Sequence, residues 1–225
     1  MTREEIQGNI KTLFENIEEL KAKYGITYAI TVEAVTKGVD LERILWAYEG
    51  GIRIMGENRV QEALLKVPFL DLDIEWHLVG HLQTNKVKHA VRIFKVIESV
   101  ERLELIDALE KRIEGKMEVF IEVNTSHESQ KTGCKEKDVD QLVERILESE
   151  KLVLTGFMTV GPYPVDELSS RRAFSKLREI KERIENDYEI KIPWLSMGMT
   201  EDYQYAIPEG ANLLRIGRGI FGRRL

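Results

Sequence analysis

The sequence predicts a (β/α)8 barrel, the TIM-barrel class of α/β fold, formed as a single domain over residues 1–225. Three observations predict it. Short apolar runs alternate with longer segments of helical period. The chain contains no linker or low-complexity stretch that would mark a second domain. Its length is one that α/β barrels commonly reach as one unit. Eight strands separated by helices favour a closed parallel barrel with right-handed crossovers over an open sheet.

The apolar runs and the turn residues between them give the order of the elements. A charged amphipathic helix opens the chain at 2–23, and later runs such as 152–158 are continuously apolar, which is typical of buried parallel strands. Strands are expected at 28–35, 52–55, 75–79, 96–99, 117–124, 152–158, 194–197 and 213–216. The intervening helices are expected at 40–48, 59–67, 84–91, 101–113, 136–149, 166–186 and 202–207.

The composition indicates a folded protein whose surface carries both signs of charge. It is 43% hydrophobic and 32% charged, which supplies a large core and a well-solvated exterior and argues against disorder. The formal net charge of -6 comes from intermixed acids and bases, so neither nucleic acid nor an anionic membrane is an expected partner.

The cysteine count and the N-terminus indicate a reducing compartment. The lone Cys134 excludes an intrachain disulfide framework. The segment 2–23 lacks the unbroken apolar core of a signal peptide, and no segment is long and apolar enough to span a membrane. We therefore expect a cytoplasmic protein.

Lys37 is the first candidate for chemistry, because it follows the first strand directly. In such barrels the functional residues lie at the C-terminal ends of the strands. A lysine there would be partly desolvated, which lowers its pKa and leaves some neutral amine to attack an aldehyde. The alternative is a lysine whose stem lies on apolar surface while its amine reaches solvent.

The glycine-rich end of the chain is a candidate phosphate site. Gly217, Gly219 and Gly222 match G-x-G-x-x-G, but a dinucleotide fingerprint needs a following helix and a later acidic residue. Loops after the last strands of a barrel, with a short helix, often bind phosphate. Gly217 and Arg218 would then offer backbone N–H groups, and the Ser196 hydroxyl would donate to the same phosphate. The alternative is a tight turn that closes the barrel.

For two further candidates, the pair of His77 and His81 and the lone Cys134, the sequence favours a structural role. His77 and His81 lie four residues apart, a spacing that aligns side chains only on a helix, whereas this segment is an expected strand with no third ligand nearby. No metal site is therefore expected. Cys134 lacks the setting of a nucleophile, and we expect no catalytic residue there.

Several motifs in order resemble one known family over nearly the whole chain. They are Ala34-Val35-Thr36-Lys37, Gly56-Glu57-Asn58-Arg59-Val60-Gln61-Glu62, Trp76-His77-Leu78-Val79-Gly80-His81-Leu82-Gln83-Thr84-Asn85-Lys86, Glu122-Val123-Asn124, Glu128 with Lys131-Thr132-Gly133, Gly156-Phe157-Met158-Thr159, Ser196-Met197-Gly198-Met199-Thr200-Glu201-Asp202, Arg215-Ile216-Gly217 and Phe221-Gly222. The chain resembles the YggS/PROSC group of pyridoxal phosphate homeostasis proteins, related in fold to the barrel domain of alanine racemase.

This resemblance implies a bound pyridoxal 5'-phosphate (PLP). It implies that Lys37 forms the Schiff base, and that Ser196, Gly217 and Arg218 hold the phosphate. Arg215 matches the arginine that faces the pyridine nitrogen in the racemase. A guanidinium there keeps the nitrogen unprotonated and makes the cofactor a poorer electron sink.

Asn58 and His77 are expected to line the same mouth of the barrel. Two residues depart from the expected pattern. Gly38 follows Lys37 where many relatives carry a small polar residue and then proline, and Glu33 interrupts the apolar first strand. Because of these departures, the sequence does not predict the conformation of the loop after Lys37.

Three functions remain open from the sequence. The first is reversible PLP binding for homeostasis, without strong catalysis and with PLP-requiring apo-enzymes as recipients; the racemase's second domain, which supplies a base to the other face, is not expected here. The second is a slow PLP-dependent amino-acid racemase or lyase. The third is a Schiff-base aldolase for a phosphorylated sugar, which predicts no cofactor. A monomer is expected, because the racemase dimer relies on that second domain.

Overall fold

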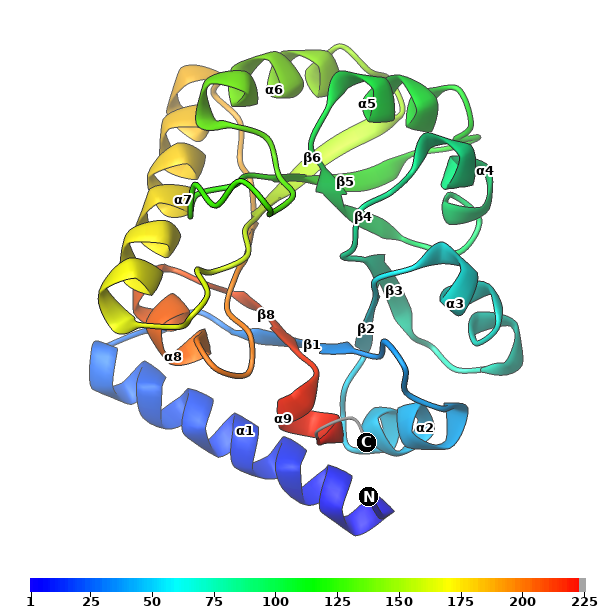
Figure 1. Ribbon diagram of the computed structural model, residues 1–225, viewed down its shortest axis with the longest axis vertical. Helices are drawn as coiled ribbons and strands as arrows, with labels where there is room; N and C mark the ends of the chain where they lie inside the picture. The colour runs from blue at the N-terminus through cyan, green and yellow to red at the C-terminus, as the bar shows by residue number, and fades with distance from the viewer. Residues whose placement is uncertain (223–225) are drawn as a thin grey trace.

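Eight parallel strands close into a barrel in the computed structural model, which describes residues 1–222. Each strand pairs with the next along the chain, and the last pairs with the first, Thr31 lying beside Leu213 and Ala34 beside Ile216. Figure 1 shows the ring of strands surrounded by helices. The strands are β1 (Thr31–Val35), β2 (Ile54–Glu57), β3 (Glu75–Leu78), β4 (Val96–Val100), β5 (Met117–Glu122), β6 (Leu152–Met158), β7 (Trp194–Ser196) and β8 (Leu213–Ile216).

The predicted barrel and the order of its elements are confirmed. The last three residues of the predicted domain lie outside the described part of the chain. The helices are α1 (Arg3–Tyr24), α2 (Leu41–Glu49), α3 (Val60–Leu64), α4 (Val87–Ala90), α5 (Leu103–Glu110), α6 (Val139–Leu147), α7 (Glu167–Asp187), α8 (Tyr203–Ala206) and α9 (Arg218–Phe221). Single 3₁₀ turns occupy Val67–Phe69, Thr84–Lys86, Glu136–Asp138 and Ile207–Glu209. The helix predicted at 59–67 is shorter than expected, and a 3₁₀ turn containing Pro68 follows it.

Helix α1 supports the region where the barrel closes. It begins at a capping box, in which the Thr2 side chain accepts from the Glu5 N–H, and ends at Gly25 in the left-handed conformation. Its buried face packs on the outside of the barrel beside α2 and α9 (Figure 1). The Asn9 amide donates to the Ile220 carbonyl at 3.0 Å, which fixes α9 after the last strand.

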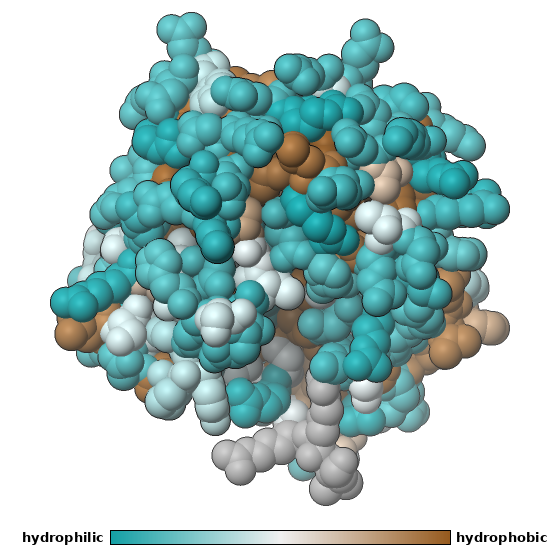
Figure 2. All heavy atoms as spheres, turned by 45° about the horizontal axis from the view of Figure 1, so that its top comes forward, coloured by the Kyte–Doolittle hydropathy of each residue, from teal (hydrophilic) through white to brown (hydrophobic). Residues whose placement is uncertain are grey.

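The core has two parts. Apolar side chains fill the layer between strands and helices, while Val96, Phe120, Met158 and Leu213 form a smaller cluster of their own. Several charged side chains are also buried. Burying a charge is costly unless the charge is paired or hydrogen-bonded, so these side chains need partners. The outer face shown in Figure 2 is mostly hydrophilic. Among residues 1–222 no helix is both long and apolar enough to cross a membrane.

Candidate functional site

Lys37 lies in the loop that leaves β1, at the C-terminal mouth of the barrel. Its side chain is half-buried and lines two adjoining hollows. One, of about 510 Å³, also contacts Gly217 and Arg218; the other, of about 370 Å³, also contacts Asn58. The next residue, Gly38, has φ +69°, which favours glycine, so the sequence departure after Lys37 reflects a left-handed turn. The structure thus brings four of the predicted residues to one mouth.

A buried ion pair fixes the backbone that carries Lys37. The Thr36 hydroxyl donates to Glu57 Oε1 at 2.6 Å, and the Lys66 amine donates to the same oxygen and to the Thr36 carbonyl, both at 2.7 Å. Burial raises the pKa of Glu57, while hydrogen bonds from Lys66 and Thr36 oppose that rise. The residue before Lys37 is therefore held through both its side chain and its carbonyl.

Glu62 extends this arrangement to the residue after Lys37. Its carboxylate accepts from the Gly38 N–H and from Lys66 at 2.7 Å. We call Glu57, Glu62 and Lys66 the Lys37 clamp. Glu57 ends β2 and Glu62 lies on α3, so the clamp joins the first two units of the barrel at the candidate site.

A third hollow, of about 540 Å³, lies where β8 leads into α9. Thr200, Arg215, Gly217 and Arg218 contribute to its walls. The Gly219 N–H donates to the Thr200 hydroxyl at 3.0 Å, which places that hydroxyl at the start of α9. The first N–H groups of a helix lack partners within it and suit an anion.

Gly217 leaves room at this end of the barrel. Its φ of -104° is accessible to any residue, and an added Cβ would meet only ordinary contacts, the nearest at 3.4 Å from the Val35 carbonyl oxygen. Neither backbone strain nor packing requires glycine there, so the space suits a bound group. Val35, Gly217 and Arg218 line both this hollow and the one that contains Lys37, so the two adjoin.

The structure does not support the expectation that Ser196 donates to a phosphate. Ser196 is fully buried at the end of β7, where its hydroxyl donates to Glu98 Oε2 at 2.5 Å and accepts from Arg215 at 2.6 Å. Thr200, four residues later, carries the hydroxyl that lies at α9. The sequence contained a signal for Thr200, because Thr200 belongs to the same motif as Ser196, at 196–202.

Arg215 lies between the barrel interior and the candidate site. Its guanidinium donates to the Ser196 hydroxyl and to the Thr159 carbonyl, both at 2.6 Å. The side chain is buried, yet it also lines the hollow beside Gly217. Two of its donors are thus held by fixed partners inside the barrel.

His77 lies inside the barrel and lines none of the three hollows at the mouth. Its Nδ1 lies 2.7 Å from Glu98 Oε1 and its Nε2 lies 3.0 Å from Glu75 Oε1. Burial alone would lower the pKa of His77, but hydrogen bonds to Glu75 and Glu98, and the charges of Glu98 and Glu33, raise it to about 10. His77 is therefore a charged imidazolium held between carboxylates inside the barrel, whereas it was expected to line the mouth.

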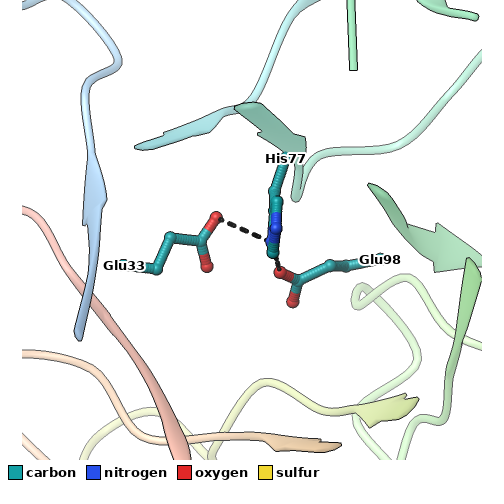
Figure 3. A group of neighbouring side chains, drawn as sticks. All are labelled: Glu33, His77 and Glu98. Carbon is teal, nitrogen blue, oxygen red and sulfur yellow. Dashed lines mark hydrogen bonds and ion pairs between the residues drawn. The ribbon is translucent and has the colours of Figure 1, made fainter. Parts of the chain in front are cut away.

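Glu33 and Glu98 approach His77 from two other strands (Figure 3). Glu33 Oε1 is 3.9 Å from His77 Nδ1, and one ligand atom from each of the three residues lies within 4.8 Å of the others. Closure of the barrel thus brings Glu33 and Glu98 to His77, and the sequence did not predict these polar neighbours. Burial first, and then the charge of Glu98, raises the pKa of Glu33 well above its usual range. Because His77 already bonds both Glu75 and Glu98, the arrangement is a charge-paired hydrogen-bond network. His81 pairs instead with Glu101, at 2.6 Å.

Comparison with known proteins agrees with this fold. Residues 9–224 match the family model described as alanine racemase, N-terminal domain. The pyridoxal phosphate homeostasis protein of Aquifex aeolicus is 41% identical over 84% of this chain and 85% of its own. The structure of an unknown protein from Bifidobacterium adolescentis is 30% identical, with a TM-score of 0.90 over 97% of this chain and 95% of that chain.

A further solved structure carries a ligand in its description. PipY of Synechococcus elongatus PCC7942, with PLP bound, is 28% identical, with a TM-score of 0.80 over 92% of this chain and 100% of that chain. The family match covers nearly all of the described residues, and the relatives align with this chain over most of their own length. The chain belongs to the alanine racemase N-terminal domain family and, within it, to the pyridoxal phosphate homeostasis proteins.

Proposed function

We propose that this protein binds PLP reversibly at the mouth of the barrel, with the Lys37 amine as its covalent anchor, and serves intracellular PLP homeostasis without strong catalysis. One observation carries the proposal. Lys37 and the phosphate-suited residues Gly217 and Arg218 line a single hollow of about 510 Å³. An aldehyde-reactive amine and an anion site are therefore combined at one place, on a chain whose relatives carry that function in their names.

The residues present fit each polar group of the cofactor. Lys37 supplies the amine for the aldehyde. The Thr200 hydroxyl and the backbone N–H groups after Gly217 suit the phosphate, so we assign to Thr200 the role first expected of Ser196. Arg215 suits the pyridine nitrogen. Asn58 lines the second hollow beside Lys37.

Arg215 supports binding over catalysis. When bound, PLP supplies an electron sink, and a protonated ring nitrogen deepens that sink. A guanidinium cannot give up its proton at physiological pH, so Arg215 donates a hydrogen bond and leaves the nitrogen unprotonated. The bonds from Arg215 to Ser196 and Thr159 keep that donor in place. An unprotonated ring nitrogen disfavours the alternative, a slow amino-acid racemase or lyase.

We further propose that the protein acts as a monomer in the cytoplasm and gives PLP to apo-enzymes that require it. The lone Cys134 supports a reducing compartment, since it is buried and has no partner for an intrachain disulfide. The face shown in Figure 2 is mostly hydrophilic. This supports a monomer, because large exposed apolar patches mark interaction surfaces.

Transfer of the cofactor tests homeostasis against catalysis. PLP-loaded protein, freed of unbound cofactor, is mixed with an apo-transaminase, and recovered transaminase activity is followed beside the same experiment with Lys37→Ala. We expect the wild type to restore activity and to show no turnover of a panel of amino acids by chiral chromatography. Robust racemisation or elimination, lost in Lys37→Ala, would instead establish the enzymatic alternative.

A further inference from the structure

A second concave surface lies at the end of the barrel opposite Lys37. It occupies about 680 Å³ between the connection from α4 to β4 and the connection from α5 to β5. We call it the lysine groove. Seven cationic side chains line it beside a single acidic one, Glu114: Lys88, Arg92, Lys95, Lys111, Arg112, Lys116 and Lys151.

The backbone places the cations of the groove side by side. Lys95, Lys116 and Lys151 each come immediately before β4, β5 and β6, three strands that are neighbours in the barrel. The Lys151 amine donates to the carbonyls of Glu110 and Ile113, at 3.1 and 2.9 Å, and so fixes the connection after α5 as a wall of the groove. The site is therefore carried by the rigid scaffold.

The cations of the groove lack ion-pair partners among the residues that the structure describes. Within residues 1–222 none of its seven cations forms an ion pair within 4.0 Å, whereas many other Lys and Arg side chains do. The pKa of Glu75 is lowered mainly by its hydrogen bond to His77 and only to a lesser extent by Lys95. In a chain with 39 acidic and 33 basic side chains, such a concentration of unpaired like charge raises the energy of the folded state until an anion neutralises it.

We propose that the lysine groove binds the polyphosphate group of a small anion. Several cations around one hollow suit a ligand with several negative charges, and the volume suits a small molecule. Phe94 is the one aromatic residue among the groove's lining, and it is 3% exposed, so the groove offers no ring on which a base could stack. Recognition is therefore of phosphates, from inorganic polyphosphate or from the phosphate tail of a nucleotide. This site does not depend on the function proposed for Lys37.

Lysine acetylation with and without ligand locates the site. Protein is treated with an acetylating reagent in the presence or absence of inorganic triphosphate, and modified lysines are quantified by mass spectrometry. We expect triphosphate to protect Lys95, Lys111 and Lys116, and to leave the exposed Lys135, Lys137 and Lys191 unprotected. Equal protection of both sets would overturn the proposal, and so would protection of neither.

A matched pair of variants tests the energetics. The triple variant Lys95→Gln, Lys111→Gln, Lys116→Gln should bind triphosphate at least about tenfold more weakly by calorimetry, a loss of about 1.4 kcal/mol. Lys135→Gln, Lys137→Gln, Lys191→Gln makes the same change in net charge elsewhere and should leave affinity unchanged. An equal loss in both variants would contradict the proposal, because it would mean only general attraction. Equal affinity for triphosphate and ATP indicates inorganic polyphosphate as the source, and tighter ATP binding indicates a nucleotide; either result keeps the phosphate site.

Discussion

The Arg215 guanidinium donates to the Ser196 hydroxyl at 2.6 Å, and that hydroxyl donates to Glu98 at 2.5 Å. Glu98 in turn bonds His77, whose other ring nitrogen bonds Glu75 at the N-terminal end of β3. A continuous hydrogen-bonded network therefore runs from Arg215, at the mouth of the barrel, to the opposite end. Ser196 thus holds the Arg215 guanidinium beside the candidate site.

The roles of the two hydroxyls can be separated with two ligands. Thr200→Val should weaken PLP binding about tenfold and leave the binding of pyridoxal, which lacks the phosphate, nearly unchanged, because one hydrogen bond to a charged group is lost. Ser196→Ala should weaken both ligands to a similar degree, since Arg215 is loosened in each case. Absorbance titrations give the dissociation constants. A phosphate-specific loss in Ser196→Ala and none in Thr200→Val would restore the role expected from the sequence.

The charge on His77 predicts how stability depends on pH. Its folded pKa of about 10 exceeds the ordinary value of 6.5, so its stabilising contribution is complete below pH 6.5 and is lost as pH rises through 10. Urea unfolding at pH 6, 8 and 10 should therefore show that the free-energy gap between wild type and His77→Gln shrinks steadily. His81→Gln is the matched control, because His81 is exposed and pairs only with Glu101. A gap that stays constant with pH would show that His77 is neutral.

The Lys37 clamp predicts a large stability effect with a specific rescue. Lys66→Met leaves the Glu57 carboxylate buried without its cation and should reduce the free energy of unfolding by about 3–5 kcal/mol. Adding Glu57→Leu removes the stranded charge and should recover much of that loss. Lys176→Met is the control, since its exposed pair with Glu136 should change stability by less than about 0.5 kcal/mol.

The same variants separate the clamp's effect on Lys37 from its effect on stability. In the rescued double variant the Thr36 carbonyl still lacks the Lys66 donor and keeps only the Val39 N–H, so capture of PLP by Lys37 should remain slower than in wild type by stopped-flow absorbance. Capture at the wild-type rate in a stable double variant would mean that the clamp supports only the fold.

Two glycines should respond oppositely to alanine. Gly38 has φ +69°, so Gly38→Ala should cost about 1–2 kcal/mol and disturb the loop beside Lys37. Gly8 lies within α1, where an added Cβ meets nothing within 4 Å, so Gly8→Ala should stabilise by about 0.5–1 kcal/mol. Thermal unfolding compares the two, and stabilisation by Gly38→Ala would contradict the left-handed turn.

The fold and the position of Lys37 could be predicted because both depend on local patterns. Apolar runs reveal parallel strands, and a residue directly after such a run must lie at the mouth of a barrel. Even the Glu33 departure has a physical basis, because it is the third residue of its strand, as are His77 in β3 and Glu98 in β4. Residues at that depth meet inside the barrel.

The interior partners of Ser196 and His77 could not be predicted from the sequence. A pattern along a strand indicates which residues face inward, but it does not tell whether a side chain near the strand end reaches the mouth or a partner in the interior. The partner of Ser196 is Glu98, 98 residues away, and the Thr36 carbonyl meets Lys66 across 30 residues. Such pairs are created by barrel closure, which no local pattern records.

Mass spectrometry of the borohydride-reduced protein tests whether Lys37 binds PLP covalently. Wild type and Lys37→Ala are incubated with PLP, reduced, digested and mapped for a phosphopyridoxyl group. We expect one stoichiometric modification on Lys37 that is absent from the variant. No modification, or one spread over surface lysines in both proteins, would contradict it and leave the Schiff-base aldolase as the reading to pursue.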